Sequence, residues 1–274
     1  MIGATSFSFP SYRNLGRYLG GTDAMVELTE LAARSFLAAA RESGNSTAHV
    51  SAASAKHGVR VNLSEVDSLA VHLNRSYIVT VYHSVERFLH EFREEHVALY
   101  QREWTGDAKG LDPLTITLKN ITESQAKAEA ELGSDLITRF HYYRIVRNWI
   151  VHTKDSDTQK PQSRFANIVP YSAEHAQLFG SVKAPNRPEE LSFDDFVFFS
   201  RLAKTIAEKI CLISKPAQED WNRLVSPTDF KRFKRLSKKP GRMRHAVAGR
   251  IKTVYGMDDL TAKWIADELC GSLA

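Results

Sequence analysis

The sequence predicts an all-α fold. Apolar residues recur three or four positions apart in several long segments, which is the period of one face of a helix. Helix-start signals precede these segments, and no convincing stretch alternates apolar and polar residues as a strand would. We therefore expect a helical bundle over residues 64–214, an N-terminal helical extension and linker over 1–63, and a basic C-terminal helical region over 215–274.

The N-terminal third is predicted to contain two helices joined by a linker. Residues 23–43 are rich in Ala and Leu and have apolar residues at helical spacing. The next segment, SGNSTAHVSAASAKHG (43–58), is rich in Ser, Ala and Gly, which indicates a loop or a flexible linker. Ser64 with Asp67 three residues on forms a capping signal, and the apolar pattern that follows predicts a long helix to about Gln101.

Two helices are predicted in the middle of the chain. Asp112 is a helix-capping residue, and Pro113 suits the first helical position, so a helix is expected from 113 to about 131. Gly133 ends it, and the segment SDLITRFHYYRIVRNWIVHT (134–153) is predicted to form the next helix.

The last third begins with an irregular segment. Residues 156–190 hold five prolines or glycines and no helical period, although RFANIVPY (164–171) is a candidate extended piece. Ser192 and Asp195 form a second capping signal in a predicted helix over 191–214. A final helix is expected at MDDLTAKWIADELC (257–270).

Composition indicates a globular protein. Apolar residues make up 43% of the 274 residues and charged residues 25%. No apolar run reaches the roughly 18 residues that span a bilayer, and the first residues lack the pattern of a secretory signal. Cys211 and Cys270 are the only cysteines, which argues against a disulfide framework or a cysteine-based zinc site. We expect a cytoplasmic location and no membrane partner.

Positive charge is concentrated near the C-terminus. Residues 221–250 contain ten Lys or Arg and one acid, a net +9 in a chain whose total is +5. Phe230 and Phe233 lie among the basic residues predicted to bind RNA, which are Lys231, Arg232, Lys234, Arg235, Lys238, Lys239, Arg242 and Arg244. Such a segment can bind phosphates and stack on bases. The alternative is a basic amphipathic helix that docks on the acidic remainder of the protein.

No metal or cofactor is expected. The chain has no Gly-rich phosphate loop in a strand–turn–helix context. His83, Glu86 and His90 share one helical face and could hold a metal ion, but such a trio is more often a set of polar groups on a helix surface.

The stretch RIVRNWIVHT (144–153) is the main candidate site. An arginine five residues before a histidine is expected about once by chance in this composition, so the spacing alone carries no information. At about 100° per residue, Arg147 and His152 point about 140° apart on one regular helix. Asn148 shares a face with His152 and with Arg144, and Arg147 borders it. A site that uses both Arg147 and His152 therefore requires a second helix, a second protomer or an opened helix end.

An arginine, an asparagine, three apolar residues and a histidine on the penultimate helix of a bundle resemble the signature of the HEPN superfamily. The order of elements is also similar, with a long helix, the motif helix, a variable loop and a closing amphipathic helix. The resemblance covers roughly residues 64–214 and lies more in this arrangement than in residue identities.

The resemblance implies a metal-independent endoribonuclease, of the kind found in toxins and host-defence effectors, that works as a homodimer with a shared cleft. His152 would be the acid/base at the ribose 2′-hydroxyl, Arg147 would bind the scissile phosphate, and Asn148 would orient one of them. The products would be a 2′,3′-cyclic phosphate and a 5′-hydroxyl. Arg144 could extend the RNA-binding band, and an antitoxin or activating partner is possible in such a system.

These roles suit the residue types. Imidazole titrates near neutral pH, and guanidinium stays charged and binds phosphate through two nitrogens. Two other hypotheses stay open. One is a non-catalytic HEPN adaptor that binds nucleic acid or a protein partner. The other is a helical regulatory protein without a site at 147–152.

Overall fold

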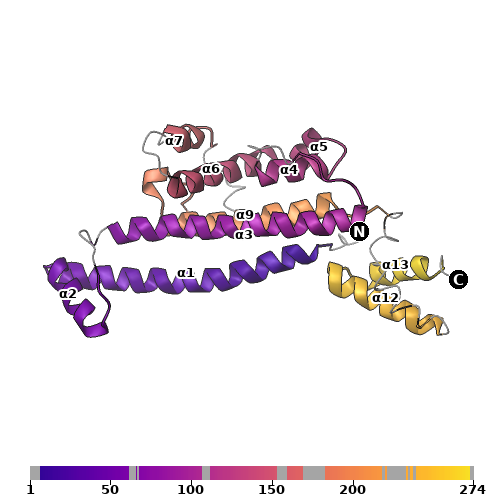
Figure 1. Cartoon of the computed structure of the whole chain (residues 1–274), viewed down its shortest axis with the longest axis horizontal. Coiled ribbons are helices and arrows are strands. Elements are labelled where there is room, and N and C mark those ends of the chain that lie inside the picture. Colours follow the sequence, from indigo (N-terminus) through magenta and orange to yellow (C-terminus); the bar gives the residue numbers. More distant parts are fainter. Residues whose placement is uncertain are drawn as a thin grey trace. The chain divides into compact units, whose positions relative to one another are not determined.

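The computed structural model describes residues 7–61, 66, 68–106, 112–152, 159–168, 183–217, 220, 233, 235–236 and 239–271. These residues form ten α-helices and one short 3-10 helix, with no strand among them, which confirms the predicted all-α class (Figure 1). The helices are α1 (Pro10–Glu42), α2 (Ser46–His57), α3 (Ser68–Tyr100), α4 (Pro113–Asn120), α5 (Gln125–Leu132), α6 (Ser134–Val151), α7 (Gln159–Phe165), η1 (Pro188–Glu190), α9 (Phe193–Ile213), α12 (Pro240–Tyr255) and α13 (Asp259–Gly271). None of these described helices is long and apolar enough to cross a membrane.

The chain divides into two compact units that are not consecutive segments. Unit 1 consists of residues 1–16, 86–134 and 204–274, and unit 2 of residues 17–85 and 135–203. The long helices α1, α3 and α9 each contribute residues to both units.

Unit 2 is layered, with α3 and α9 between α1 and α6 (Figure 1). Helix α1 contacts both middle helices, since the Tyr77 hydroxyl of α3 lies 3.4 Å from Glu30 and the Ser200 hydroxyl of α9 donates to Asp23 at 3.0 Å. On the other side, α6 stacks Tyr143 on Phe199 of α9 with 4.5 Å between ring centroids.

A buried carboxylate ties α6 to the start of α9. The Tyr143 hydroxyl donates to Asp195 Oδ1 at 2.9 Å, and the backbone N–H groups of Asn186 and Ser192 donate to the same carboxylate at 2.9 Å each. Burial raises the pKa of Asp195, and these hydrogen bonds oppose that rise. The Ser192 hydroxyl also accepts from the Asp194 N–H at 3.2 Å, so the predicted capping arrangement at Ser192 and Asp195 is confirmed.

Unit 1 has an aromatic core around the second half of α3. Phe9 packs edge-on against Phe92 at 5.1 Å, and the Ser8 N–H donates to the Tyr255 carbonyl at 2.9 Å. The Tyr100 hydroxyl donates to the backbone carbonyl that follows α9, at Ser214. Helices α12 and α13 pack against each other.

The N-terminal predictions need two corrections. Helix α1 begins at Pro10 rather than at residue 23, because Leu15 and Leu19 are buried and their packing outweighs the low helix propensity of nearby glycines. The predicted linker over 43–58 forms α2 instead. Asn45 caps that helix by accepting from the Ala48 N–H, and Gly58 ends it with φ +65°.

The middle of the chain follows the predicted signals with one break. Asp112 accepts hydrogen bonds from the Leu114 and Thr115 N–H groups at 3.1 Å, which confirms the predicted cap. The single helix expected over 113–131 is wrong, since Ser124 starts a second helix, α5, by accepting from the Lys127 N–H. Helix α3 matches the predicted long helix, but its predicted cap at Ser64 and Asp67 lies outside the described residues.

The described parts of the segment 156–190, residues 159–168 and 183–190, are less irregular than predicted. They contain α7 and η1, and residues 164–168 form the end of α7 and a turn rather than an extended piece. Residues 169–171 of the same predicted piece lie outside the described residues. The predicted final helix is confirmed as α13.

Candidate functional site

The motif RIVRNWIVHT occupies the C-terminal half of α6. Tyr142, Tyr143 and Val146 are buried, which fixes the rotation of α6 in unit 2. This rotation leaves Arg144, Arg147 and Asn148 half-buried at the edge of the packed face.

The Arg147 guanidinium is held by two neighbours. Its Cζ lies 5.0 Å from the ring centroid of Tyr82 in α3, a cation–π contact. Its Nη1 donates to the Asn148 Oδ1 at 3.1 Å. Two of the three predicted catalytic residues, Arg147 and Asn148, are therefore joined by a side-chain hydrogen bond.

His152 directly follows α6, and its side chain is exposed. Its backbone N–H donates to the Asn148 carbonyl at 2.9 Å, which is a helical i to i−4 bond. The backbone thus keeps helical hydrogen bonding up to the His152 N–H, one residue beyond the end of α6 at Val151. Within the described part of the chain, no hydrogen bond joins the His152 imidazole to Arg147 or Asn148.

Sequence reasoning missed Tyr82 and Arg75, two residues of α3 that support this part of α6. Arg75 places its Cζ 4.7 Å from the ring centroid of Trp149. Arg75 Nε, Arg144 Nε and Trp149 Nε1 are buried and have no hydrogen-bond acceptor among the described residues. The available signal was the position of Arg75, seven residues or about two helical turns before Tyr82, within the apolar pattern of α3.

The predicted basic segment is described only in part. Arg235, Lys239, Arg242 and Arg244 are exposed, whereas Lys231, Arg232, Lys234 and Lys238 lie outside the described residues.

The two phenylalanines of that segment do not offer a described stacking platform. The Phe233 ring is buried and cannot stack on a base from solution, and Phe230 lies outside the described residues.

Acidic residues of α13 face some of the positive charges of α12. Arg244 Nε lies 3.5 Å from Asp267 Oδ1, and Lys252 Nζ lies 3.4 Å from Asp259 Oδ1. Because both pairs are exposed to solvent, they neutralise charge more than they stabilise the hairpin. Whether the basic segment binds nucleic acid or docks on the bundle stays a prediction.

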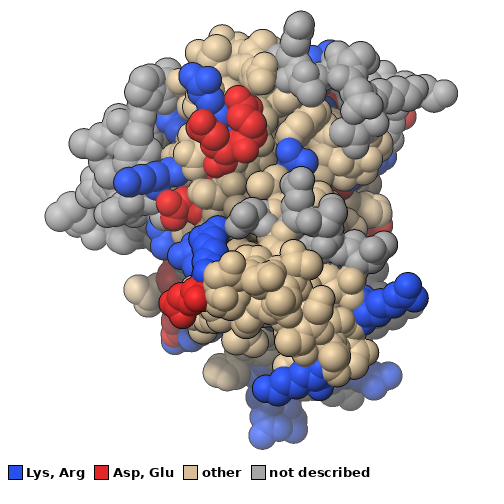
Figure 2. Space-filling view, turned by 90° about the vertical axis from the view of Figure 1, so that its left-hand side faces the viewer, with Lys and Arg blue, Asp and Glu red and all other residues tan. Residues whose placement is uncertain are grey.

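Figure 2 shows the end of unit 2 at which α2 lies, with charges of both signs. Among the described residues of this face, basic side chains are separated by acidic and uncharged ones, so they form no continuous positive surface. On the described part of this face, anion binding would thus depend on individual basic side chains rather than on a continuous positive surface.

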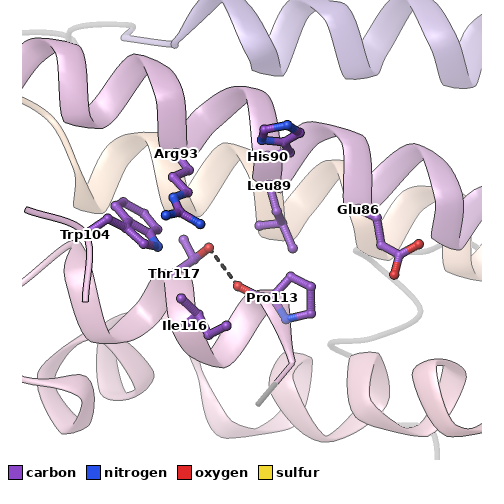
Figure 3. A pocket seen from close by; sticks show the side chains of 8 residues that line it. All are labelled: Glu86, Leu89, His90, Arg93, Trp104, Pro113, Ile116 and Thr117. Atoms are coloured by element: carbon purple, nitrogen blue, oxygen red, sulfur yellow. Dashed lines mark hydrogen bonds between the residues drawn. The ribbon is translucent and has the colours of Figure 1, made fainter. Parts of the chain in front are cut away.

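Unit 1 contains a hollow of about 210 Å³ between α3, α4 and the chain around Trp104 (Figure 3). It is lined by Glu86, Leu89, His90, Arg93, Trp104, Pro113, Ile116 and Thr117. The Arg93 guanidinium lies 5.9 Å from the Trp104 ring centroid, and the Thr117 hydroxyl donates to the Pro113 carbonyl at 2.8 Å. Two members of the possible metal trio, Glu86 and His90, line this hollow, but the described residues contain no group of three His, Cys, Asp or Glu that could hold a metal ion.

Comparison with known proteins adds no assignment to this geometry. No protein-family model matches the chain, and neither the curated proteins nor the solved structures give a match.

Proposed function

We propose that the chain is a metal-independent endoribonuclease of the HEPN type that acts as a toxin or host-defence effector. Arg147, Asn148 and His152 are its catalytic residues in this proposal. The observation that carries it is the Arg147 guanidinium, which contacts Tyr82 and Asn148 and lies five residues before an exposed histidine.

The reaction needs only groups that these residues supply. The ribose 2′-oxygen attacks the adjacent phosphorus, a 2′-O–P bond forms, and the P–5′-O bond breaks. The 2′-hydroxyl loses its proton to a base, and the leaving 5′-oxygen gains one. An exposed imidazole can perform such transfers near neutral pH, and a fixed guanidinium can stabilise charge on the phosphorane.

The proposal requires a second protomer, because the backbone keeps helical hydrogen bonding up to the His152 N–H. On such a helix Arg147 and His152 point about 140° apart, so one chain cannot direct both at one phosphate. In a shared cleft, His152 of one protomer acts with the partner's Arg147. Each site of the dimer then draws one catalytic group from each chain.

Arginines beside the motif provide contacts for the RNA backbone. Arg75 and Arg144 have buried Nε atoms without an acceptor in the described part of the chain, and both are half-buried. A phosphate would instead bind the exposed part of either guanidinium through a charge-assisted hydrogen bond. Exposed residues of α12, Arg242 among them, are a second possible contribution to RNA capture.

The direct test is cleavage of mixed-sequence RNA in excess EDTA. We expect His152→Ala and Arg147→Ala to lower the rate by at least about 100-fold, the loss typical of removing an acid/base or a charge-stabilising group. The matched control is His57→Ala, since His57 is exposed at the end of α2. If wild type leaves every RNA intact, or if His152→Ala cuts at the wild-type rate, the proposal is wrong.

Mixing the two inactive variants tests the shared cleft separately. A heterodimer of His152→Ala and Arg147→Ala chains retains one site with both groups intact, so activity should return to a fraction of the wild-type rate. If each site instead took both catalytic groups from one chain, no activity would return, because neither variant chain has both groups. RNA binding without cleavage in all samples would instead support the adaptor hypothesis.

A further inference from the structure

Helix α1 has an exposed face that is almost entirely uncharged. Its members recur alternately four and three residues apart and are all exposed: Arg17, Gly21, Ala24, Leu28, Leu31, Ser35, Ala38 and Glu42. We call these eight residues the α1 stripe. Leu28 is 67% exposed and Leu31 63%, and the two lie side by side at the centre of the stripe.

The stripe lies opposite the face by which α1 packs in unit 2. Val26, Leu37 and Ala40 are buried on that other face. A 4–3 alternation is the seam of a two-helix coiled coil, in which a second helix covers every member. Helix α1 therefore has two faces with the pattern of a contact surface. One packs in the core of unit 2, and the other, the α1 stripe, is exposed.

The order of residues in the stripe is symmetric about a point between Leu28 and Leu31. In an antiparallel pair of α1 helices related by a twofold axis, Leu28 meets the partner's Leu31, and Ala24 meets the partner's Ser35. Further out, Gly21 meets the partner's Ala38. Small residues on both sides of the leucines let the two backbones approach closely.

Charge favours the antiparallel direction. At each end of the stripe Arg17 would meet the partner's Glu42, whereas a parallel pair would place Arg17 against Arg17 and Glu42 against Glu42. Glu27 and Arg34 are both exposed on one flank, where antiparallel helices bring Glu27 near the partner's Arg34. The other flank carries Met25, 62% exposed, which extends the apolar contact.

We propose that α1 associates with α1 of a second copy of this chain as an antiparallel, twofold-symmetric helix pair. Such an isologous contact needs one surface that is complementary to itself, as the α1 stripe is. The stripe is roughly 38 Å long at 1.5 Å per residue, and eight residues a side fall below the 20–30 of a standard interface. The association is therefore expected in the micromolar range.

This contact is distinct from the shared cleft of the proposed nuclease. In unit 2, α3 and α9 lie between α1 and α6, so the α1 stripe and the motif helix face opposite ways (Figure 1). The α1 pair does not depend on nuclease activity. A chain that used both contacts would assemble beyond a dimer.

Charge reversal at the ends of the stripe tests the pair by sedimentation velocity of the full chain between about 1 and 100 µM. Arg17→Glu and Glu42→Arg each place like charges at both ends, and we expect each to weaken association about tenfold at low salt. The double variant Arg17→Glu/Glu42→Arg restores opposite charges and should return to within about twofold of wild type. The antiparallel pairing would be overturned if wild type, both single variants and the double variant associated equally. It would also be overturned if the double variant associated no more tightly than the single variants.

A second comparison tests the leucines. Leu28→Glu/Leu31→Glu places four carboxylates at the centre of the pair. The number of chains in the assembly, measured by sedimentation velocity, should therefore fall by half. The control is Leu260→Glu, because Leu260 is 80% exposed in α13 and lies outside the stripe. Circular dichroism checks that helical content is retained. If the Leu28→Glu/Leu31→Glu variant keeps the wild-type mass, the α1 contact does not exist, whatever the RNA assays give.

Cysteine crosslinking fixes the direction of the pair. The native Cys211 and Cys270 are buried and do not compete. Ala24→Cys/Ser35→Cys should form a disulfide between two chains, since these positions are about 16 Å apart along one helix and cannot bond within it. A crosslink in the Ala24→Cys single variant would reveal parallel helices, and no crosslink in the double variant would exclude the register.

Discussion

His96 lies within an aromatic cluster of unit 1, and its protonation is expected to destabilise the fold. The imidazole centroid is 4.5 Å from that of Tyr100, 5.4 Å from Trp104 and 5.7 Å from Phe92. Burial, with a smaller contribution from Arg102, lowers the pKa of His96 to about 4. The residue is therefore buried in its neutral form at pH 7.

The sign and size of the effect follow from proton linkage. In the unfolded chain the His96 pKa is near 6.5, so between about pH 4 and 6.5 the unfolded state binds more protons than the folded state. Stability contributed by neutral His96 is thus present above pH 6.5 and is lost as the pH falls. The pKa difference corresponds to about 3 kcal/mol in full, of which about 2 kcal/mol is lost by pH 5.

Urea unfolding at pH 7 and pH 5 measures this loss against His96→Phe, which keeps an aromatic ring but cannot bind a proton. We expect the unfolding free energy of wild type to drop by about 2 kcal/mol more than that of the variant over this interval. His96→Gln provides a second variant in case phenylalanine overpacks the cluster. Equal pH dependence in wild type and both variants would refute the account of His96.

Three further predictions concern single contacts. Tyr143→Phe removes the hydrogen bond to the buried Asp195 and should cost about 1.5–3 kcal/mol in urea unfolding, whereas an unchanged midpoint would mean that this bond contributes nothing. Asp112→Ala removes the cap of α4, which accepts from the Leu114 N–H, and should lower stability by about 1 kcal/mol in the same assay; no loss would contradict a stabilising cap. Arg75→Gln in the His152→Ala background should reduce the slope of log affinity for single-stranded RNA against log salt by about 0.7, and an unchanged slope would exclude a phosphate contact at Arg75.

The helices that could be predicted from sequence are those whose signals are local and whose packing is amphipathic. Helices α3 and α9 have both a periodic apolar face and, for α9, a capping pair at Ser192. Helix α2 buries no residue, so it has no apolar period to detect and depends on Asn45, Gly58 and its alanines. The break between α4 and α5 depends on one serine cap, at Ser124, which outweighs a continuous run of helix-forming residues.

The candidate site was only partly predictable for a related reason. Arg147 and Asn148 are adjacent in the sequence, and helix geometry alone predicts that His152 points elsewhere. Tyr82 and Arg75 contact α6 through the register between α3 and α6, two segments more than 60 residues apart in the chain. That register depends on the packing of whole helices and has no signature near the motif.

The ends of the cleaved RNA show whether the residues of α6 and His152 catalyse attack by the ribose 2′-hydroxyl. Two oligonucleotides of one sequence are incubated with the protein in EDTA, one entirely RNA and one with 2′-deoxyribose at the cleaved position. We expect that only the first is cut at this position, to a 2′,3′-cyclic phosphate and a 5′-hydroxyl, and that His152→Ala does not cut it. Cleavage of the deoxy-substituted strand, or 5′-phosphate ends, would contradict the proposal.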